Sequence, residues 1–332
     1  MAEYKGLKTL CETTKGKLAS IATELLGGGR KLADDLGQEL SAVLVGSGIS
    51  GLAKEAIAFG ADKVYIVDDK LLKDYQTDSY VIVMERVVKQ VMPQILILGQ
   101  TSIGRDLAPR LAFRLDTAAS MGCLELAIDP QSKQLLQTKP VYGGNAQAVF
   151  VCSAYPQIAT VRAKAMTPLA PDGSRKGEVI TIAAGLDPSA IRTKMVEKVP
   201  EKVEGIRLED AKVIVSGGRG IGGAEGFKQL EELARMVKGA VGATRPPCDN
   251  GWMPAGAQVG LTGKIITPDL YIAVALSGSS QHMSGCSGSK TIIAINKDPE
   301  ANIFREARFG VVGDWKKVLP AFTSKLKELL VG

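Results

Sequence analysis

Histidine and aromatic residues are scarce in this 332-residue chain: aromatics make up 5% of it, and His282 is its single histidine. A zinc site with several histidine ligands is therefore excluded, and any chemistry that needs an imidazole must use His282. With so few aromatics, the bases of a single nucleic acid strand would find little to stack on. We therefore expect no nucleic acid partner despite the net charge of +6. We interpret the charge as a contribution to solubility or as a surface for an acidic partner.

Paired cysteines and long apolar runs are also missing. The five cysteines are odd in number, far apart and never in a CxxC pair, which indicates neither a disulfide framework nor a zinc or iron–sulfur site. No uncharged apolar run approaches the roughly 20 residues that a membrane-spanning helix needs. The first 30 residues mix Lys and Glu without an apolar segment. We expect a soluble cytoplasmic protein with reduced thiols, no metal site and no membrane insertion.

The length and the hydrophobic pattern predict two domains. A chain of 332 residues that is 45% hydrophobic suffices for two domains of ordinary size. Short apolar runs alternate with amphipathic stretches throughout, which is typical of mainly parallel sheets covered by helices, the α/β class. From Met166 to Glu209 the sequence is rich in turn residues and charges and is interrupted by Pro200. We therefore expect an N-terminal α/β domain of residues 1–205 and a second α/β domain of residues 206–332.

Local hydrophobic patterns predict the positions of the clearest helices and strands. Apolar residues recur at helical spacing in residues 18–25, 227–237 and 315–330, and the last of these is expected to be a docked helix. The predicted strands are Ala42–Val45, Val64–Val67, Ile95–Leu98, Val149–Cys152, Val213–Ser216, Tyr271–Leu276 and Thr291–Ile295.

A glycine-rich loop follows the strand at 42–45. Gly46, Gly48 and Gly51 form the GxGxxG pattern of dinucleotide-binding folds, and Asp68 stands near the distance at which such folds place their ribose-binding acid. The same pattern also serves as a plain strand-to-helix turn, and we favour that structural interpretation. The alternative is a free-standing NAD-dependent dehydrogenase that binds its cofactor through this loop.

A second glycine loop, Gly217–Gly223, contains Arg219 and precedes a predicted helix. Backbone N–H groups at a helix start bind anions, and an arginine adds a charge-assisted contact to a phosphate or to a flavin ring. Ligands of open α/β sheets bind at the carboxyl ends of the strands, so we expect the polar segments that follow strands to converge on one crevice suited to a polyphosphate with a polar ring system. Those segments are 242–245, 258–264, 277–282 and 296–299.

Long motifs in both halves resemble the α subunit of electron transfer flavoproteins. In the second half they are VSGGRG at 215–220, ATR at 243–245, QVGxTGK at 258–264, LYIAVALSGSSQH at 270–282 and TIIAINKDPEANIF at 291–304. In the first half they are GADKVYIVDD at 60–69, GQTSIGRDLAPRLAFRL at 99–115 and YGGNAQA at 142–148. The resemblance therefore covers nearly the whole chain.

The resemblance implies an electron carrier without catalytic residues of its own. It implies one FAD in a Rossmann-like C-terminal domain, and an N-terminal domain that serves as scaffold and β-subunit interface without a dinucleotide. The β subunit would carry AMP. Electrons would come from a dehydrogenase of the acyl-CoA type, as in fatty acid β-oxidation, and pass to a quinone oxidoreductase or a low-potential acceptor. A variant of this function is a bifurcating complex that oxidises NADH with a second FAD in the β subunit.

Carried over residue by residue, the resemblance also implies a set of FAD contacts. Reduction places negative charge on the N1–C2=O edge of the flavin, where a cation or hydrogen-bond donor stabilises the reduced form. We expect His282 at C2=O, Arg245 over or beside the ring and Thr262 near N5. The serines of 277–280 would serve the pyrophosphate, and Asn296 and Asp314 the adenosine side. The implied contacts are Arg219, Thr244, Arg245, Val259, Gly260, Leu261, Thr262, Ser277, Gly278, Ser279, Ser280, Gln281, His282, Asn296 and Asp314.

Structural roles remain open for several of these residues. His282 could be a hydrogen-bonded structural residue, Arg245 a partner in a surface ion pair, and Met283 a core residue. The sequence departs from the family pattern at two places: Leu261 stands where the family has Gln, and Pro246-Pro247 stiffens the backbone beside Arg245. Neither departure threatens FAD binding, but both put in doubt that the flavin has the redox behaviour of the family. A structural adaptor without any cofactor is the third alternative.

Overall fold

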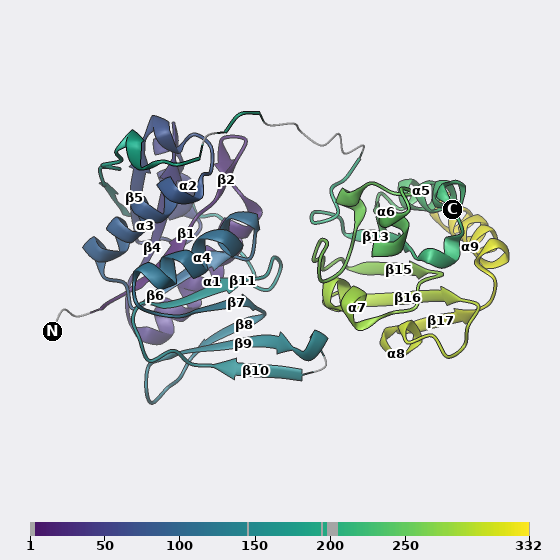
Figure 1. Cartoon of the computed structure of the whole chain (residues 1–332). Coiled ribbons are helices and arrows are strands. Elements are labelled where there is room, and N and C mark those ends of the chain that lie inside the picture. Colours follow the sequence, from purple (N-terminus) through teal and green to yellow (C-terminus); the bar gives the residue numbers. More distant parts are fainter. Residues whose placement is uncertain (1–3, 145, 194, 198–204, 332) are drawn as a thin grey trace. The chain divides into compact units, whose positions relative to one another are not determined.

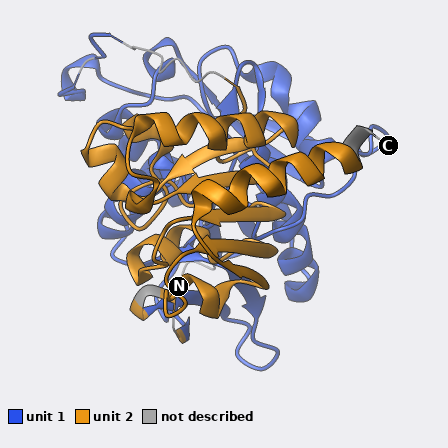
Figure 2. Ribbon diagram, turned by 90° about the vertical axis from the view of Figure 1, so that its right-hand side faces the viewer, with its two compact units in different colours: residues 1–141, 147–198 blue, residues 142–146, 199–332 orange. Residues whose placement is uncertain are grey.

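The computed structural model describes residues 4–144, 146–193, 195–197 and 205–331. The chain forms two compact units, residues 1–141 with 147–198, and residues 142–146 with 199–332 (Figure 1, Figure 2). Each unit contains a parallel sheet between two apolar clusters, which confirms the predicted α/β class with two domains. Segment 142–146 groups with the second unit, which the sequence did not indicate. Among the described helices, none has the length and apolar character that a membrane crossing needs.

A seven-stranded parallel sheet forms the centre of the first unit, in the order β12-β5-β4-β1-β6-β11-β7. Successive residues of β6 face opposite sides: Ile95 and Ile97 pack with helices α1 and α2, whereas Leu96 and Leu98 pack with α3 and α4. Strands covered on both faces are apolar throughout, which is why short apolar runs identified them. The strands are β1 Leu7–Leu10, β4 Leu40–Gly46, β5 Lys63–Asp68, β6 Ile95–Gly99, β7 Ala119–Cys123, β11 Gln157–Val161 and β12 Glu178–Thr181. The helices are α1 Ser20–Leu36, α2 Ala53–Ala58, α3 Thr77–Val91 and α4 Ser102–Arg114.

Two small sheets accompany the large one. Strands β2 (Thr13–Thr14) and β3 (Lys17–Leu18) form an antiparallel pair, and a three-stranded sheet has the order β10-β9-β8. The prediction that Val149–Cys152 forms a strand of the mainly parallel sheet is wrong: the strand is β10, Ala146–Phe150, and it belongs to this separate sheet. An exposed apolar strand and a buried one look alike as short apolar runs, which explains the error. The other two strands are β8 Glu125–Ile128 and β9 Leu135–Val141.

A five-stranded parallel sheet of order β14-β13-β15-β16-β17 organises the second unit. Helices α5 and α9 cover one face through Phe227 and Leu319, and α7 and α8 cover the other through Met283 and Ile303. Met283 is thus a core residue. The strands are β13 Val213–Gly217, β14 Ala240–Ala243, β15 Leu270–Val274, β16 Thr291–Asn296 and β17 Phe309–Val312. The helices are α5 Ala224–Met236, α6 Arg245–Asp249, α7 Ser280–Cys286, α8 Ile303–Glu306 and α9 Trp315–Val331.

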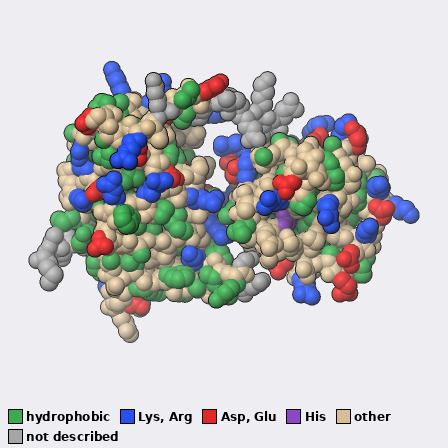
Figure 3. Space-filling model, viewed as in Figure 1, with side chains coloured by type: hydrophobic (Ala, Val, Ile, Leu, Met, Phe, Trp, Pro, Cys, Tyr) green, Lys and Arg blue, Asp and Glu red, His purple; other side chains and the backbone are tan. Residues whose placement is uncertain are grey.

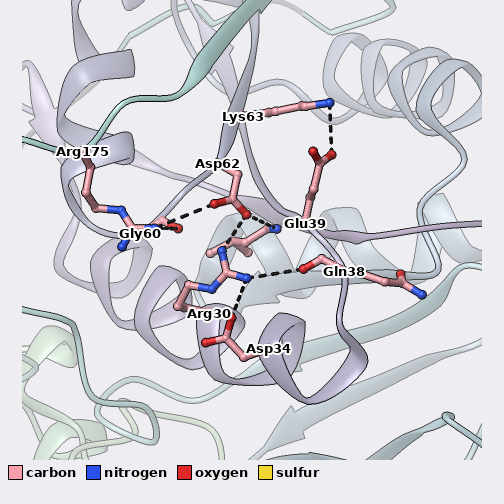
Figure 4. Close-up of polar contacts among 9 residues, drawn as sticks. Arg30, Asp34, Gln38, Glu39, Gly60, Asp62, Lys63 and Arg175 are labelled. Carbon is pink, nitrogen blue, oxygen red and sulfur yellow. Dashed lines mark hydrogen bonds and ion pairs between the residues drawn. The ribbon is translucent and has the colours of Figure 1, made fainter.

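A polar network fixes α1 to the amino ends of β4 and β5 (Figure 4). The Arg30 guanidinium donates to Asp62 Oδ2 at 2.6 Å and pairs with Asp34 at 2.8 Å. The same Asp62 oxygen accepts from the amide of Leu40, the first residue of β4, at 2.9 Å. The Arg30 side chain is only 15% exposed, so its charge needs these carboxylates as compensation.

Replacing Asp62 by alanine is expected to destabilise the first unit. Arg30 would lose its less exposed partner and the Leu40 amide its acceptor, so the free energy of unfolding should fall by about 2 kcal/mol or more. Asp34→Ala is the matched control, since its carboxylate is 64% exposed and its removal should cost less than about 1 kcal/mol. Urea unfolding of both variants measures the difference, and equal losses would contradict this account of the network.

Candidate functional site

The expected site residues gather at one edge of the five-stranded sheet. Its neighbouring strands all pair in parallel, so the carboxyl ends of the strands lie along the same edge. Strand β13 lies between β14 and β15, and the chain continues from β13 to β14 before β15 forms on the other side. The point where strand order reverses, between β13 and β15, is where open α/β sheets bind ligands. At this edge Arg219 follows β13, Thr244 and Arg245 follow β14, Ser277–His282 follow β15, Asn296 ends β16 and Asp314 follows β17.

The glycine loop after β13 lies directly against the end of β15. The amide of Gly218 donates to Val274 at 3.1 Å, and the amide of Gly220 donates to Ala275 at 3.2 Å. A Cβ at Gly218 would come within 2.5 Å of the Ala275 carbonyl oxygen, so only glycine permits this approach. The indole of Trp315, at the start of α9, donates to the Gly220 carbonyl at 3.1 Å. Sequence reasoning missed the anchoring role of Trp315, because a tryptophan at helical spacing indicates only packing.

The segment Val259–Thr262 is held between β14 and α7. The Val259 amide donates to Ala243 at 2.8 Å, and the Leu261 amide donates to Gln281 at 2.7 Å. A Cβ at Gly285 would lie 2.4 Å from the Gly260 nitrogen, so α7 and this loop approach at backbone distance. The structure therefore brings the expected residues of 259–262 and those of 277–282 together.

His282 is buried and both of its ring nitrogens have partners inside the second unit. Nδ1 lies 3.0 Å from the Val259 carbonyl oxygen, and Nε2 lies 2.8 Å from the hydroxyl of Tyr271. A carbonyl only accepts, so Nδ1 carries the proton and Nε2 accepts from Tyr271. Burial lowers the pKa of His282 to about 4, against the smaller opposing effect of the Val259 carbonyl. The imidazole thus joins β15, α7 and the 259–262 segment and is neutral at pH 7, and its placement at the flavin C2=O stays a prediction.

Several other expected residues have partners within the protein. Arg245 pairs with Asp249 of the same short helix at 3.1 Å, and both side chains are well exposed. This contact is the surface ion pair that the sequence left open as an alternative role for Arg245. The Asn296 amide donates to the Leu276 carbonyl at 2.8 Å, which ties β16 to the end of β15. Asp314 accepts from the Lys316 amide at 3.0 Å at the start of α9. The exposed Arg245 pair is weak and exchanges partners at little cost, whereas the Asn296 and Asp314 contacts shape the edge itself.

The donors at this edge fit an anionic cofactor such as FAD. Ser277, Ser279 and Ser280 are exposed there, and the first N–H groups of α7 have no acceptor within their own helix. Arg219 is exposed in the neighbouring glycine loop. Hydroxyls, helix-start amides and a guanidinium are the groups that bind a pyrophosphate. Leu261 is 57% exposed, an apolar side chain beside this polar set.

The GxGxxG loop of the first unit is satisfied by its own chain. The carboxylate of Asp68 accepts from the amides of Gly48 at 2.7 Å, Ile49 at 3.0 Å and Ser50 at 3.2 Å, and from the Ser50 hydroxyl at 2.7 Å. Burial opposes ionisation, but the hydrogen bonds from Ser50, Gly48 and Ile49 outweigh it and lower the pKa of Asp68. Asp68, which stands in the position of a ribose-binding acid, thus accepts hydrogen bonds from the amides that would otherwise face a phosphate. This geometry supports the structural interpretation of the loop.

The buried histidine predicts a pH dependence of stability. Because the folded state lowers the pKa of His282 from 6.5 to about 4, the unfolded chain binds a proton at His282 before the folded protein does as the pH falls. Stability is therefore complete above the unfolded pKa and declines between pH 6.5 and 4, by about 2 kcal/mol at pH 5. Urea unfolding at pH 7 and pH 5 measures this, and His282→Gln should remove that share of the decline. An identical decline in the variant would contradict the assigned environment.

Comparisons with known proteins agree over both units. Residues 8–187 match the Electron transfer flavoprotein domain, and residues 207–287 match the Electron transfer flavoprotein FAD-binding domain. The electron transfer flavoprotein subunit alpha of Thermoanaerobacterium thermosaccharolyticum is 45% identical over 99% of this chain and 100% of its own length, and that of Megasphaera elsdenii is 44% identical over 99% and 98%. The acryloyl-CoA reductase electron transfer subunit beta of Anaerotignum propionicum is 36% identical over 98% and 96%. The chain belongs to the electron transfer flavoprotein α-subunit family.

Proposed function

We propose that this protein carries electrons as the FAD-containing subunit of a heterodimer with a β subunit, with one FAD bound by its second unit. The observation that carries the proposal is the convergence of Arg219, the 259–262 segment and the Ser277–Ser280 turn at the carboxyl edge of the five-stranded sheet. These three segments lie within residues 207–287, which match the FAD-binding domain of the family. Bound FAD supplies reversible uptake of electrons at its isoalloxazine ring.

The residues of the edge divide into binding and shaping roles under this proposal. Ser277, Ser279 and Ser280, with the amides that begin α7, hold the pyrophosphate, and Arg219 contributes positive charge. Arg245 and Thr262 lie beside the ring, where positive charge and a hydroxyl favour the reduced flavin. His282 and Asn296 act through the backbone that they hold in place. Thr244, Val259, Gly260, Leu261, Gly278, Gln281 and Asp314 complete the lining.

The electron donor that we propose is a dehydrogenase of the acyl-CoA type. The Anaerotignum propionicum relative is named as the electron transfer subunit of an acryloyl-CoA reductase, and it aligns with almost the whole chain. The acceptor would be a quinone oxidoreductase or a low-potential carrier. In this arrangement the chain transforms no substrate, and its residues serve to bind, orient and tune the flavin.

Substitution of the two arginines tests the location of the cofactor. Arg219→Ala and Arg245→Ala should each lower the FAD bound per chain at least severalfold, because each removes a cation from the edge of the five-stranded sheet. Asp68→Asn is the control for the dehydrogenase alternative and should leave the FAD content unchanged. Flavin absorbance of the purified proteins measures the content. Loss of flavin only in the Asp68 variant would contradict the proposal, and a wild-type protein that stays colourless with added FAD and the β subunit would favour the adaptor.

Cofactor stoichiometry of the reconstituted heterodimer decides between the simple and the bifurcating carrier. We expect one FAD and one AMP per heterodimer and no reduction of the flavin by NADH. Nucleotides released from the denatured complex are quantified by chromatography, and anaerobic titration with NADH follows the flavin spectrum. Two FAD per heterodimer together with reduction by NADH would assign the protein to a bifurcating complex instead.

A further inference from the structure

A surface groove lies between helices α3 and α4 of the first unit. It encloses about 700 Å³, and the segment 189–192 lines it together with the two helices. Lys and Arg side chains lie over α3 and α4 on the visible face of this unit, next to hydrophobic ones (Figure 3). A cavity of this volume is in the range of small-molecule sites. The groove is formed by residues of the first unit alone, so it is separate from the edge of the five-stranded sheet.

Arg110, on the α4 side of the groove, is only partly engaged by the protein. Its Nε donates to Asp106 at 3.2 Å, and Asp106 also accepts from the hydroxyls of Tyr75 at 2.7 Å and Thr77 at 2.5 Å. The Arg110 side chain is 60% exposed, and its two terminal nitrogens have no partner among the described residues. These nitrogens are free to form the paired hydrogen bonds by which arginine binds a phosphate.

The other two arginines of the groove are held as loosely. Arg114 Nη1 lies 3.5 Å from Glu85, a long hydrogen bond, and that carboxylate also accepts from Lys89 at 2.6 Å. The Arg192 amide donates to Asp78 at 3.1 Å, while its exposed guanidinium has no partner in the part of the chain that the structure describes. Asp78 is the single acid among the described residues that line the groove, so three cations face one carboxylate. This excess of positive charge favours a ligand with at least two negative charges.

Phe113 presents an aromatic ring on the same face of α4 as Arg110. Residues three positions apart are neighbours on a helix surface, so the ring lies beside the Arg110 side chain. Phe113 is 85% exposed, and Val81 and Pro109 add apolar lining to the groove. A purine base stacks on such a ring, whereas an inorganic anion gains nothing from it. The three cations converge on one cavity instead of forming a stripe, which favours a compact ligand over an extended acidic peptide.

We propose that the α3–α4 groove binds a nucleoside diphosphate, with its base stacked on Phe113 and its phosphates held by the three arginines of the groove. The same chemical group occurs as free ADP and as the ADP part of coenzyme A, and both present a purine together with two linked phosphates. Binding joins α3, α4 and the segment 189–192 through one ligand. The site is independent of the electron-carrier function and of the flavin.

Calorimetric titration of the full-length protein with ADP tests the site. The protein is loaded with FAD and freed of excess FAD, so that the proposed flavin site stays filled. Arg110→Ala should weaken ADP binding about tenfold, because it removes a charge-assisted contact to phosphate. Arg105→Ala removes the same charge from α4 outside the groove, and this matched control should bind ADP like the wild type.

A second substitution tests the stacking of the base. Phe113→Ala should weaken ADP binding at least fivefold but leave the binding of inorganic pyrophosphate unchanged, because only the nucleotide has a base to stack. All three substituted side chains are exposed, so the variants should fold, and circular dichroism with flavin content verifies this. Titration with coenzyme A identifies the source: tighter binding than that of ADP, weakened in the same way by Arg110→Ala, would support the proposal and assign the groove to coenzyme A.

Absence of binding by both ADP and coenzyme A at millimolar concentration would overturn the proposal, and so would equal ADP binding by the Arg110→Ala and Arg105→Ala variants. An equal loss of ADP and pyrophosphate binding in the Phe113→Ala variant would contradict the stacked base. Loss of β-subunit binding in the Arg110→Ala variant, in a protein that binds no ADP, would make the groove a protein contact and also overturn the nucleotide site.

Discussion

The close approach of the Gly217–Gly223 loop to the end of β15 is the constraint on which the rest of the second unit depends. Strands β13 and β15 are neighbours in the sheet, and the amides of Gly218 and Gly220 bond to Val274 and Ala275. This contact lies at the point where strand order reverses. Trp315 fastens α9 to the same loop through the Gly220 carbonyl, so the last helix of the chain depends on it as well.

A second set of contacts places segments 259–262 and 277–282 around that point. The buried His282 joins the Val259 carbonyl to the Tyr271 hydroxyl, and the Leu261 amide bonds to Gln281. A neutral histidine suits this task because one nitrogen donates to the carbonyl and the other accepts from the hydroxyl. The single histidine of the chain thus ties three segments of the second unit together.

The sequence predicted the fold class and the gathering of the expected site residues at the carboxyl ends of the strands. It did not predict the orientation of individual side chains. Apolar runs identified β4, β6, β13 and β16 because both faces of these strands are buried. The same signal misplaced Val149–Cys152, since exposure depends on the neighbours that a strand acquires in the fold. Motifs placed His282 beside the flavin-binding segments, yet the partner of each ring nitrogen lies 11 or 23 residues away in sequence, and spacing carries no information on it. The sequence also could not predict the hydrogen bonds from the Gly48 loop to Asp68, although these bonds support the structural interpretation of the GxGxxG pattern.

The central claim is that FAD binds at the carboxyl edge of the five-stranded sheet and that the Gly46–Gly51 loop binds no nucleotide. Hydrogen–deuterium exchange of the full-length protein with and without FAD tests it most directly, because it reports on both loops in one experiment. The account predicts slower exchange in residues 217–223, 258–264 and 277–282 on addition of FAD, and unchanged exchange in residues 46–51. Protection confined to residues 46–51 would contradict it.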